Sequence, residues 1–215
     1  MFEKDASAMP IYHLAVKSVS RSTGRSAVAA IAYRAGGCLE NERDGLVQDY
    51  TRRSGIEDAF IVVPQGAEWA EDRSALWNAA EAAEKRNDAK VAREYELGLP
   101  AELDAGQRRD LVRAFAEDIR DRYGVAVDAA IHAPHDYGDD RNHHAHVMTT
   151  TRVVDADGLG RRRASSTCVH RRQSRSRRSG SGGPNRSTMR WNWRRWPSGA
   201  IIAAIPAKAS RWSQP

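Results

Sequence analysis

The stretch VAVDAAIHAPHDYGDDRNHHAHVMTTTRVV, residues 125–154, contains two β-rich runs on either side of a polar segment. The runs 125–133 and 145–154 are rich in valine, threonine and other residues that are typical of strands. The intervening segment PHDYGDDRNHH, residues 134–144, consists largely of turn-forming and charged residues. This stretch therefore predicts two strands of a sheet that can pair through the polar loop.

Histidines gather in the same stretch, where five of the seven fall within 15 residues. Because successive side chains of a strand point to opposite faces, His144 and His146 share a face. If the two strands pair, His132 can face them from the end of the first strand. Three neutral imidazoles on one face could bind a divalent metal and leave positions open for substrate oxygens. His143 on the opposite face and His135 in the loop are weaker candidates, and a histidine-rich polar loop without metal is the alternative.

The remainder of residues 1–158 alternates between strand patterns and helix patterns. Strands are predicted at 11–19, 47–51, 58–64 and 91–100, and helices at 27–35, 67–86 and 103–124. Ser26 is the predicted N-cap of the first helix, and glycines end the first and third helices. The strands 47–51 and 58–64 are predicted to pair around the turn RRSG at 52–55. Together these patterns indicate one α/β domain with a mixed or mainly antiparallel sheet.

The net charge of +6 is divided unevenly along the chain. Residues 1–158 hold 20 Lys and Arg and all 28 Asp and Glu, whereas residues 159–215 hold 14 Lys and Arg and no acid. The predicted domain is therefore acidic, and any binding of nucleic acid by it requires a local basic patch. Two cysteines argue against a disulfide framework. No apolar run is long enough for a membrane span, and the N-terminal residues lack the apolar core of a secretory signal.

Tyr33 is the candidate nucleophile because it lies late in a short helix of small residues, AVAAIAYRA, beside Arg34. A phenol has a pKa near ~10 and needs a nearby cation or base before it can attack at neutral pH. The alternative interpretation is a helix-end tyrosine that packs on the sheet.

Five blocks of the sequence resemble the MobA/MobL group of plasmid relaxases, which are HUH endonucleases. These are PIYHLAVKSVSRSTGRSAVAAIAYRAG, VQDYTRRSG, LWNAAEAAEKRNDAKVAREYELGLP, VAVDAAIHAPH and NHHAHVMTTTRV, in this order. The resemblance implies an α+β relaxase fold with a central, mainly antiparallel five-stranded sheet flanked by helices. It further implies a bacterial, plasmid-encoded cytoplasmic enzyme that nicks and religates one DNA strand at an origin of transfer through a 5′-phosphotyrosine. Accessory mobilization proteins and a type IV secretion coupling protein would be further partners.

The resemblance also implies roles for individual residues. Tyr33 matches the family nucleophile, and His132, His144 and His146 match ligands of a divalent metal, Mg²⁺ or Mn²⁺. Glu94 matches a carboxylate near the active centre that could accept the tyrosine proton or orient a histidine, and Glu96 ranks below it. Cations predicted to contact DNA are Lys17, Arg21, Arg25, Arg34, Arg52 and Arg53, each with a solvated surface charge as the alternative.

The two ends of the chain depart from the family pattern. Met9 precedes the first family block, so residues 1–8 are expected to be an extension and residues 9–160 the relaxase domain. Residues 161–215 are rich in Arg, Ser and Trp and are expected to be disordered, either as a frameshifted reading of the gene or as a nucleic-acid-binding arm. With this tail, the chain could instead be a DNA-binding remnant that cannot nick. A hydrolase that uses metal-activated water is the third possibility.

Overall fold

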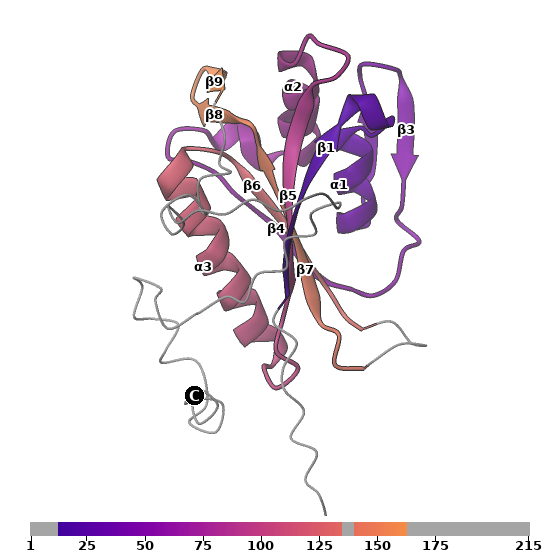
Figure 1. The fold of residues 1–215 in the computed structure, drawn as a ribbon, viewed down its shortest axis with the longest axis vertical. Helices are drawn as coiled ribbons and strands as arrows, with labels where there is room; N and C mark the ends of the chain where they lie inside the picture. Colours follow the sequence, from indigo (N-terminus) through magenta and orange to yellow (C-terminus); the bar gives the residue numbers. More distant parts are fainter. Residues whose placement is uncertain (1–12, 135–139, 163–215) are drawn as a thin grey trace, which may run out of the picture.

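Five strands form one antiparallel sheet in the order β1-β5-β7-β6-β4 (Figure 1). The computed structural model describes residues 13–134 and 140–162. In sheet order the strands are β1 (Leu14–Ser20), β5 (Lys90–Gly98), β7 (His144–Thr150), β6 (Val127–His132) and β4 (Ile56–Val62). The helices are α1 (Ala27–Ala35), α2 (Arg73–Ala83) and α3 (Ala105–Tyr123), with short 3₁₀ helices η1 (Arg21–Thr23) and η2 (Glu68–Glu71). The predicted α+β fold with a five-stranded antiparallel sheet is confirmed.

The alternation of side chains gives this sheet two apolar faces, each covered by helices (Figure 1). On one face the residues of β6 and β7 that pack with α3 are Val127, Ala129, Ile131, Ala145 and Val147. On the other face, Met148 of β7 packs in a cluster with residues of α1 and α2, including Ile31 and Trp77. Positions 132, 144 and 146 have the same parity as this second set in their strands, so their side chains lie on the face that α1 covers.

Both ends of α1 and the C-terminal end of α3 are where local sequence signals predict them, whereas α3 begins two residues later than predicted. The Ser26 side chain accepts a hydrogen bond from the Ala29 amide, and Gly36 ends α1 with φ +63°. A Cβ at position 36 would collide with Cδ1 of Ile56, so a glycine lets the start of β4 pack against this helix end. Asp104 and Gln107 form a reciprocal capping box at α3, and Gly124 ends it.

The predicted pairing of 47–51 with 58–64 is wrong. β3 (Leu46–Asp49) pairs instead with β2 (Cys38–Asn41), a strand that the sequence pattern did not indicate, and β4 pairs with β6. The physical reason is the turn at residues 41–45, where the Asn41 side chain bonds Asp44 and Gly45 adopts φ +68°. This tight turn closes a hairpin of β2 and β3. Residues 50–55 therefore form the crossing segment that connects this two-stranded sheet to β4 of the five-stranded sheet.

Two other predicted elements are interrupted by polar side chains. The helix expected at 67–86 is divided, because Asp72 has an extended backbone and its side chain caps α2 at the Ala75 amide (2.7 Å). The strand expected at 145–154 ends at Thr150, whose hydroxyl donates to the Arg152 carbonyl (2.8 Å). Beyond this turn, β8 (Arg152–Asp155) pairs with β9 (Gly158–Arg162) in a separate hairpin.

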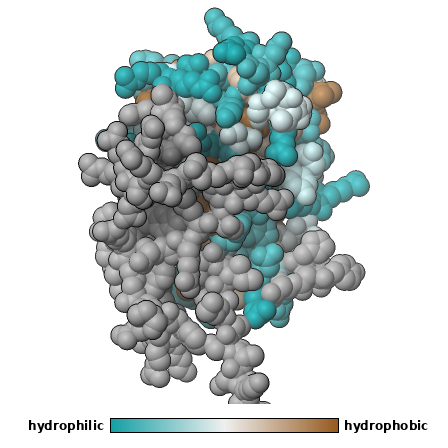
Figure 2. Space-filling view, in the orientation of Figure 1, coloured by the Kyte–Doolittle hydropathy of each residue, from teal (hydrophilic) through white to brown (hydrophobic). Residues whose placement is uncertain are grey.

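On the side of the molecule drawn in Figure 2, the described surface is mostly hydrophilic. Val16, Leu46 and Val47 are the exposed large aliphatic residues of the described chain. None of the helices in residues 13–134 and 140–162 is long and apolar enough to cross a membrane. The predicted extension 1–8, His135 and the tail from residue 163 onward lie outside the described residues.

Candidate metal centre

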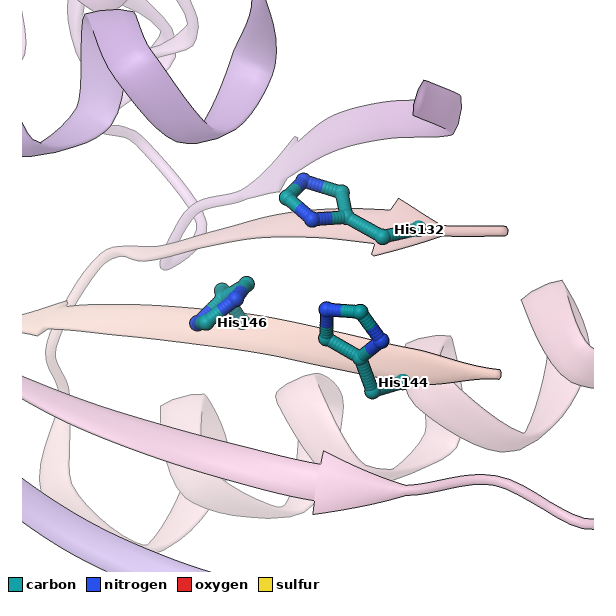
Figure 3. Close-up of side chains that lie close together, drawn as sticks. All are labelled: His132, His144 and His146. Atoms are coloured by element: carbon teal, nitrogen blue, oxygen red, sulfur yellow. The ribbon is translucent and has the colours of Figure 1, made fainter. Parts of the chain in front are cut away.

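The register of β6 and β7 brings three histidines together at one end of the sheet (Figure 3). His132 pairs directly with His144, and His146 pairs with Ala130 in the next pair on the same face. The ring centroids lie 5.0–5.3 Å apart, and one ring nitrogen of each histidine lies within 4.8 Å of those of the other two. The spacing argument from the sequence therefore corresponds to a real cluster, built from the two central strands.

Each imidazole is oriented by a hydrogen bond to a protein oxygen. His132 Nε2 donates to the Arg34 carbonyl (2.7 Å), and His144 Nδ1 donates to the Asn142 carbonyl (3.0 Å). His146 Nδ1 donates to Glu94 Oε1 (2.7 Å). Because a carbonyl or carboxylate oxygen only accepts, these nitrogens carry a proton, and the other nitrogen of each ring is the one that offers a lone pair when the ring is neutral. Three such lone pairs match what a divalent metal requires, and outer oxygens that fix the tautomer are typical of metal sites.

The local electrostatics keep His132 neutral. Burial lowers its pKa to about 4, and the nearby His146, His144 and Arg53 act in the same direction, although the Arg34 carbonyl opposes them. A neutral imidazole is the form that binds a metal. His132 is therefore in the metal-binding form at neutral pH before any ion arrives.

Glu94 on β5 connects this cluster to α1. Its fully buried carboxylate accepts two hydrogen bonds from the Arg34 guanidinium, one of them at 2.8 Å, besides the bond from His146. Burial raises the pKa of Glu94, but the hydrogen bonds from His146 and Arg34 outweigh it and lower the pKa to about 2. Both carboxylate oxygens are thus engaged, and one of them holds His146. Glu96 lies opposite His146 in the register and forms an ion pair with Lys17.

Tyr33 lies on α1, one residue before the carbonyl that holds His132. Its side chain is about half exposed, and its ring makes an edge contact with Tyr50 at a centroid distance of 5.2 Å. The guanidinium carbon of Arg53 lies 3.7 Å from the Tyr33 ring centroid. Tyr33 therefore packs against residues 50–55, at the end of α1 where the next residue's carbonyl bonds His132.

The cations predicted to contact DNA differ in their exposure and in whether an acidic side chain already pairs with them. Arg25 and Arg52 are exposed, whereas Arg53 covers Tyr33. Lys17 and Arg34 are ion-paired to Glu96 and Glu94, as described above. Arg21 is buried against Glu81 of α2, with Nη2 2.7 Å from Oε2. This last contact joins η1 to α2, which indicates a structural role for Arg21.

Sequence reasoning missed three parts of this centre. The carbonyls of Arg34 and Asn142 act through the backbone, which leaves no trace in residue type. The third part is Tyr50, whose position against Tyr33 depends on the crossing segment 50–55. His143, by contrast, lies as expected on the α3 side, with Nδ1 3.1 Å from Glu57 Oε1.

Comparison with known proteins identifies the family. The MobA/MobL family profile matches residues 25–212, well over half of the chain. The chain belongs to the MobA/MobL family. The matched residues of this MobA/MobL member extend past position 160, where the sequence pattern placed the end of the domain.

Relatives of this MobA/MobL chain are mobilization and conjugal transfer proteins. Mobilization protein MobL of Acidithiobacillus ferridurans is 41% identical over 184 residues, which cover 75% of this chain and 48% of that protein. Conjugal transfer protein TraA of Rhizobium radiobacter is 37% identical over 163 residues, covering 71% of this chain and 14% of TraA. The chain thus spans about half the length of the first relative and a small part of the second.

A solved structure from work on the molecular basis of vancomycin resistance transfer in Staphylococcus aureus has the same fold. It is 30% identical to this MobA/MobL chain, with a TM-score of 0.64, and the match covers 74% of this chain and 79% of that chain. The fold expected from the resemblance is therefore confirmed independently of the sequence blocks.

Proposed function

We propose that this chain nicks and rejoins a single DNA strand at a plasmid origin of transfer, with Tyr33 as the nucleophile. The observation that carries this proposal is the set of three imidazoles that converge on the face that α1 covers, each with one ring nitrogen bonded to a protein oxygen. The helix that bears Tyr33 is joined to this set through the Arg34 carbonyl and the Arg34–Glu94 ion pair. Membership of a family of mobilization and conjugal transfer proteins agrees with the proposal.

The histidines are proposed as the metal ligands, through Nδ1 of His132 and Nε2 of His144 and His146. A divalent ion such as Mn²⁺ or Mg²⁺ supplies positive charge for the non-bridging oxygens of the phosphate. The chain's own contribution is to aim three rings at one place, since each outer hydrogen bond prevents its ring from turning.

The Tyr33 hydroxyl is proposed to lose its proton and attack phosphorus. A bond forms between the phenol oxygen and the 5′ phosphate, the bond to the 3′ oxygen breaks, and that oxygen takes up a proton. One phosphodiester replaces another, so the reverse attack by a 3′ hydroxyl rejoins the strand without ATP. This retention of bond energy is why a tyrosine suits the reaction better than water.

Glu94 is proposed as a positioning residue rather than the base. Its two oxygens already accept hydrogen bonds from Arg34 and His146, and its low pKa makes it a weak proton acceptor. Holding His146 in one tautomer is the role that fits these contacts. The proton of Tyr33 would then pass to solvent, because the ring is about half exposed.

Single-stranded plasmid DNA is the proposed substrate, with accessory mobilization proteins and a secretion coupling protein as further partners in the bacterial cytoplasm. The exposed Arg25 and Arg52 are the cations most available to phosphates around the centre.

Covalent trapping tests the proposal. Labelled strands from the plasmid that carries the gene are incubated with Mn²⁺, and protein-linked label is measured after denaturation. Tyr33→Phe should abolish linkage and cleavage while DNA binding stays within a few-fold, because only the nucleophilic oxygen is lost. Binding without linkage by the unmodified chain would identify a non-nicking remnant. Cleavage retained in Tyr33→Phe would instead indicate hydrolysis by water.

A further inference from the structure

Arg53 lies in the segment that joins the two halves of the candidate site. At one end of this segment, the Tyr50 amide donates to the Gly37 carbonyl just beyond α1 (3.0 Å). At the other end, the Ala133 amide donates to the Gly55 carbonyl just beyond β6 (2.9 Å). Residues 50–55 are therefore attached both beside the helix of Tyr33 and beside the strand of His132.

The Arg53 guanidinium restrains the Tyr33 ring. It lies over the ring at 3.7 Å from the centroid, and Tyr50 contacts the same ring edge-on, with an interplanar angle of 89°. A cation over an aromatic face is an attractive contact. A half-exposed tyrosine would otherwise sample several orientations, so these two contacts select one of them.

One donor of Arg53 has no acceptor in the part of the chain that the structure describes. Its Nη1 is buried yet has no hydrogen-bond partner among the described residues. Buried donors are almost always paired, so an unpaired guanidinium nitrogen calls for an acceptor. By contrast, Arg34, Arg73 and Arg108 each make two hydrogen bonds to a carboxylate. Arg53 is also close enough to His132 for its charge to contribute to the lowered pKa of that ring.

A phosphate oxygen is the acceptor that matches the unpaired Nη1 donor of Arg53. A guanidinium presents a planar fork of donors that matches phosphate oxygens, and its charge persists at all relevant pH values. We propose that Arg53 binds a phosphate oxygen of the DNA strand beside the three histidines while it holds the Tyr33 ring in the orientation for attack. This inference rests on the proposed function and names the residue that couples substrate binding to the nucleophile.

The phosphate contact is tested by binding in the Tyr33→Phe background, where no cleavage occurs. The probe is a single strand selected by repeated binding from a random pool of strands. Arg53→Ala should weaken its binding roughly 10- to 100-fold, the loss expected for a hydrogen bond to a charged group. The slope of log affinity against log salt should become shallower by about 0.7, the value for one phosphate of a single strand. Arg122→Ala is the matched control, since it removes the same charge from α3, which covers the opposite face.

A phosphate scan locates the contact. Each phosphate of the selected strand is replaced in turn by an uncharged methylphosphonate, and binding is compared between the protein that retains Arg53 and the Arg53→Ala variant. At one position the methylphosphonate and Arg53→Ala should be non-additive. Once the charge of that phosphate is removed, Arg53→Ala should lower the DNA affinity no further. Equal losses at every position, or a loss no larger than that of Arg122→Ala, would overturn the proposal.

The substitution Arg53→Lys separates positioning of Tyr33 from charge. It keeps the positive charge but loses the planar face over the ring. With native Tyr33, we expect DNA affinity within a few-fold of the unmodified chain and single-turnover nicking at least about tenfold slower. Circular dichroism and urea unfolding check that the variant folds. Nicking at the unmodified rate would contradict the positioning role.

Failure of the proposed function has a different signature. If the unmodified chain binds a selected strand but never becomes linked to it, nicking is refuted and the phosphate scan still decides the Arg53 contact. If no strand can be selected from the pool, both the function and this inference are refuted.

Discussion

Each histidine of the candidate metal centre owes its orientation to an oxygen elsewhere in the chain. The three oxygens come from α1, β5 and the loop before β7, so the centre depends on elements that are far apart in the sequence. The donors are imidazole nitrogens without a carboxylate, a set that suits borderline transition metals better than Mg²⁺. We therefore expect Mn²⁺ to bind more tightly than Mg²⁺.

Loss of a proposed ligand should be measurable by calorimetric titration with Mn²⁺. Alanine in place of His144 or His146 should lower the affinity by at least about tenfold, since even changes around a ligand cost 10- to 100-fold. His143→Ala is the control, because that side chain lies next to Glu57 on the α3 side. Unchanged affinity in both His144→Ala and His146→Ala would refute the three-histidine site.

The two glutamates of β5 should differ in their effect on the metal. Glu94→Gln replaces the carboxylate that holds His146 and Arg34 with a neutral amide, so Mn²⁺ affinity should fall by about 10- to 100-fold. Glu96→Gln alters a residue opposite His146 that pairs with Lys17, and should change the affinity by no more than a few-fold. Calorimetric titration with Mn²⁺ measures both affinities. A larger loss of Mn²⁺ affinity in Glu96→Gln than in Glu94→Gln would reverse the assignment of the two roles.

At the scale of elements, a buried glutamate of α2 joins two other segments to that helix. Glu81 Oε1 accepts from the Ala27 amide at the start of α1 (2.7 Å), and Oε2 accepts from the Arg21 guanidinium (2.7 and 2.9 Å). The Glu81 side chain is only 1% exposed and that of Arg21 8%, so each buried charge is compensated by the opposite charge of the other. This contact positions α1, and with it Tyr33, against the sheet.

Removal of this carboxylate should therefore weaken the fold. Glu81→Ala leaves the buried Arg21 guanidinium with backbone carbonyls as acceptors but without its carboxylate, and we expect the free energy of unfolding to fall by about 3–5 kcal/mol. Arg86→Ala breaks the exposed pair with Asp88 and should cost less than about 1 kcal/mol. Urea denaturation followed by circular dichroism measures both. Equal midpoints for the two variants would mean that Glu81 does not hold α1.

At the scale of the whole molecule, charge is separated along the chain. The strand-and-helix region up to residue 158 has an excess of acid, and all of the basic excess follows it. Residues 163–215 contain 12 of the 34 Lys and Arg. Binding of DNA at low salt should therefore be dominated by counterions that leave the DNA when cations of the C-terminal segment neutralise its phosphates, whatever the sequence preference.

Deletion of residues 163–215 should make DNA affinity much less dependent on salt. Discrimination between an origin strand and a scrambled strand should persist, because the proposed recognition and cleavage residues all precede residue 163. Fluorescence anisotropy across a salt series measures both quantities. If the deletion abolished discrimination, the C-terminal segment would be a genuine recognition arm rather than a frameshifted tail.

Local signals in the sequence were sufficient for much of the fold and for the three-histidine cluster. Alternation along 144–148 put His144 and His146 on one face, and the caps Ser26, Gly36 and Gly124 set helix ends, because these effects depend only on neighbouring residues. The position of Tyr33 beside Arg34 made it a candidate, and the family blocks then added Glu94 and a role for each of the two residues.

Tertiary structure alone decided how these pieces meet. β4 pairs with β6 rather than with β3, and Arg34 reaches Glu94 across 60 positions of the chain. The same is true of Arg53 over Tyr33 and of the carbonyls that orient His132 and His144. Such contacts depend on which strands become neighbours and on backbone oxygens that every residue possesses. Local periodicity predicts neither strand order nor the partners of backbone oxygens. Strand order is selected by the burial of both sheet faces at once, which involves residues far apart in the sequence.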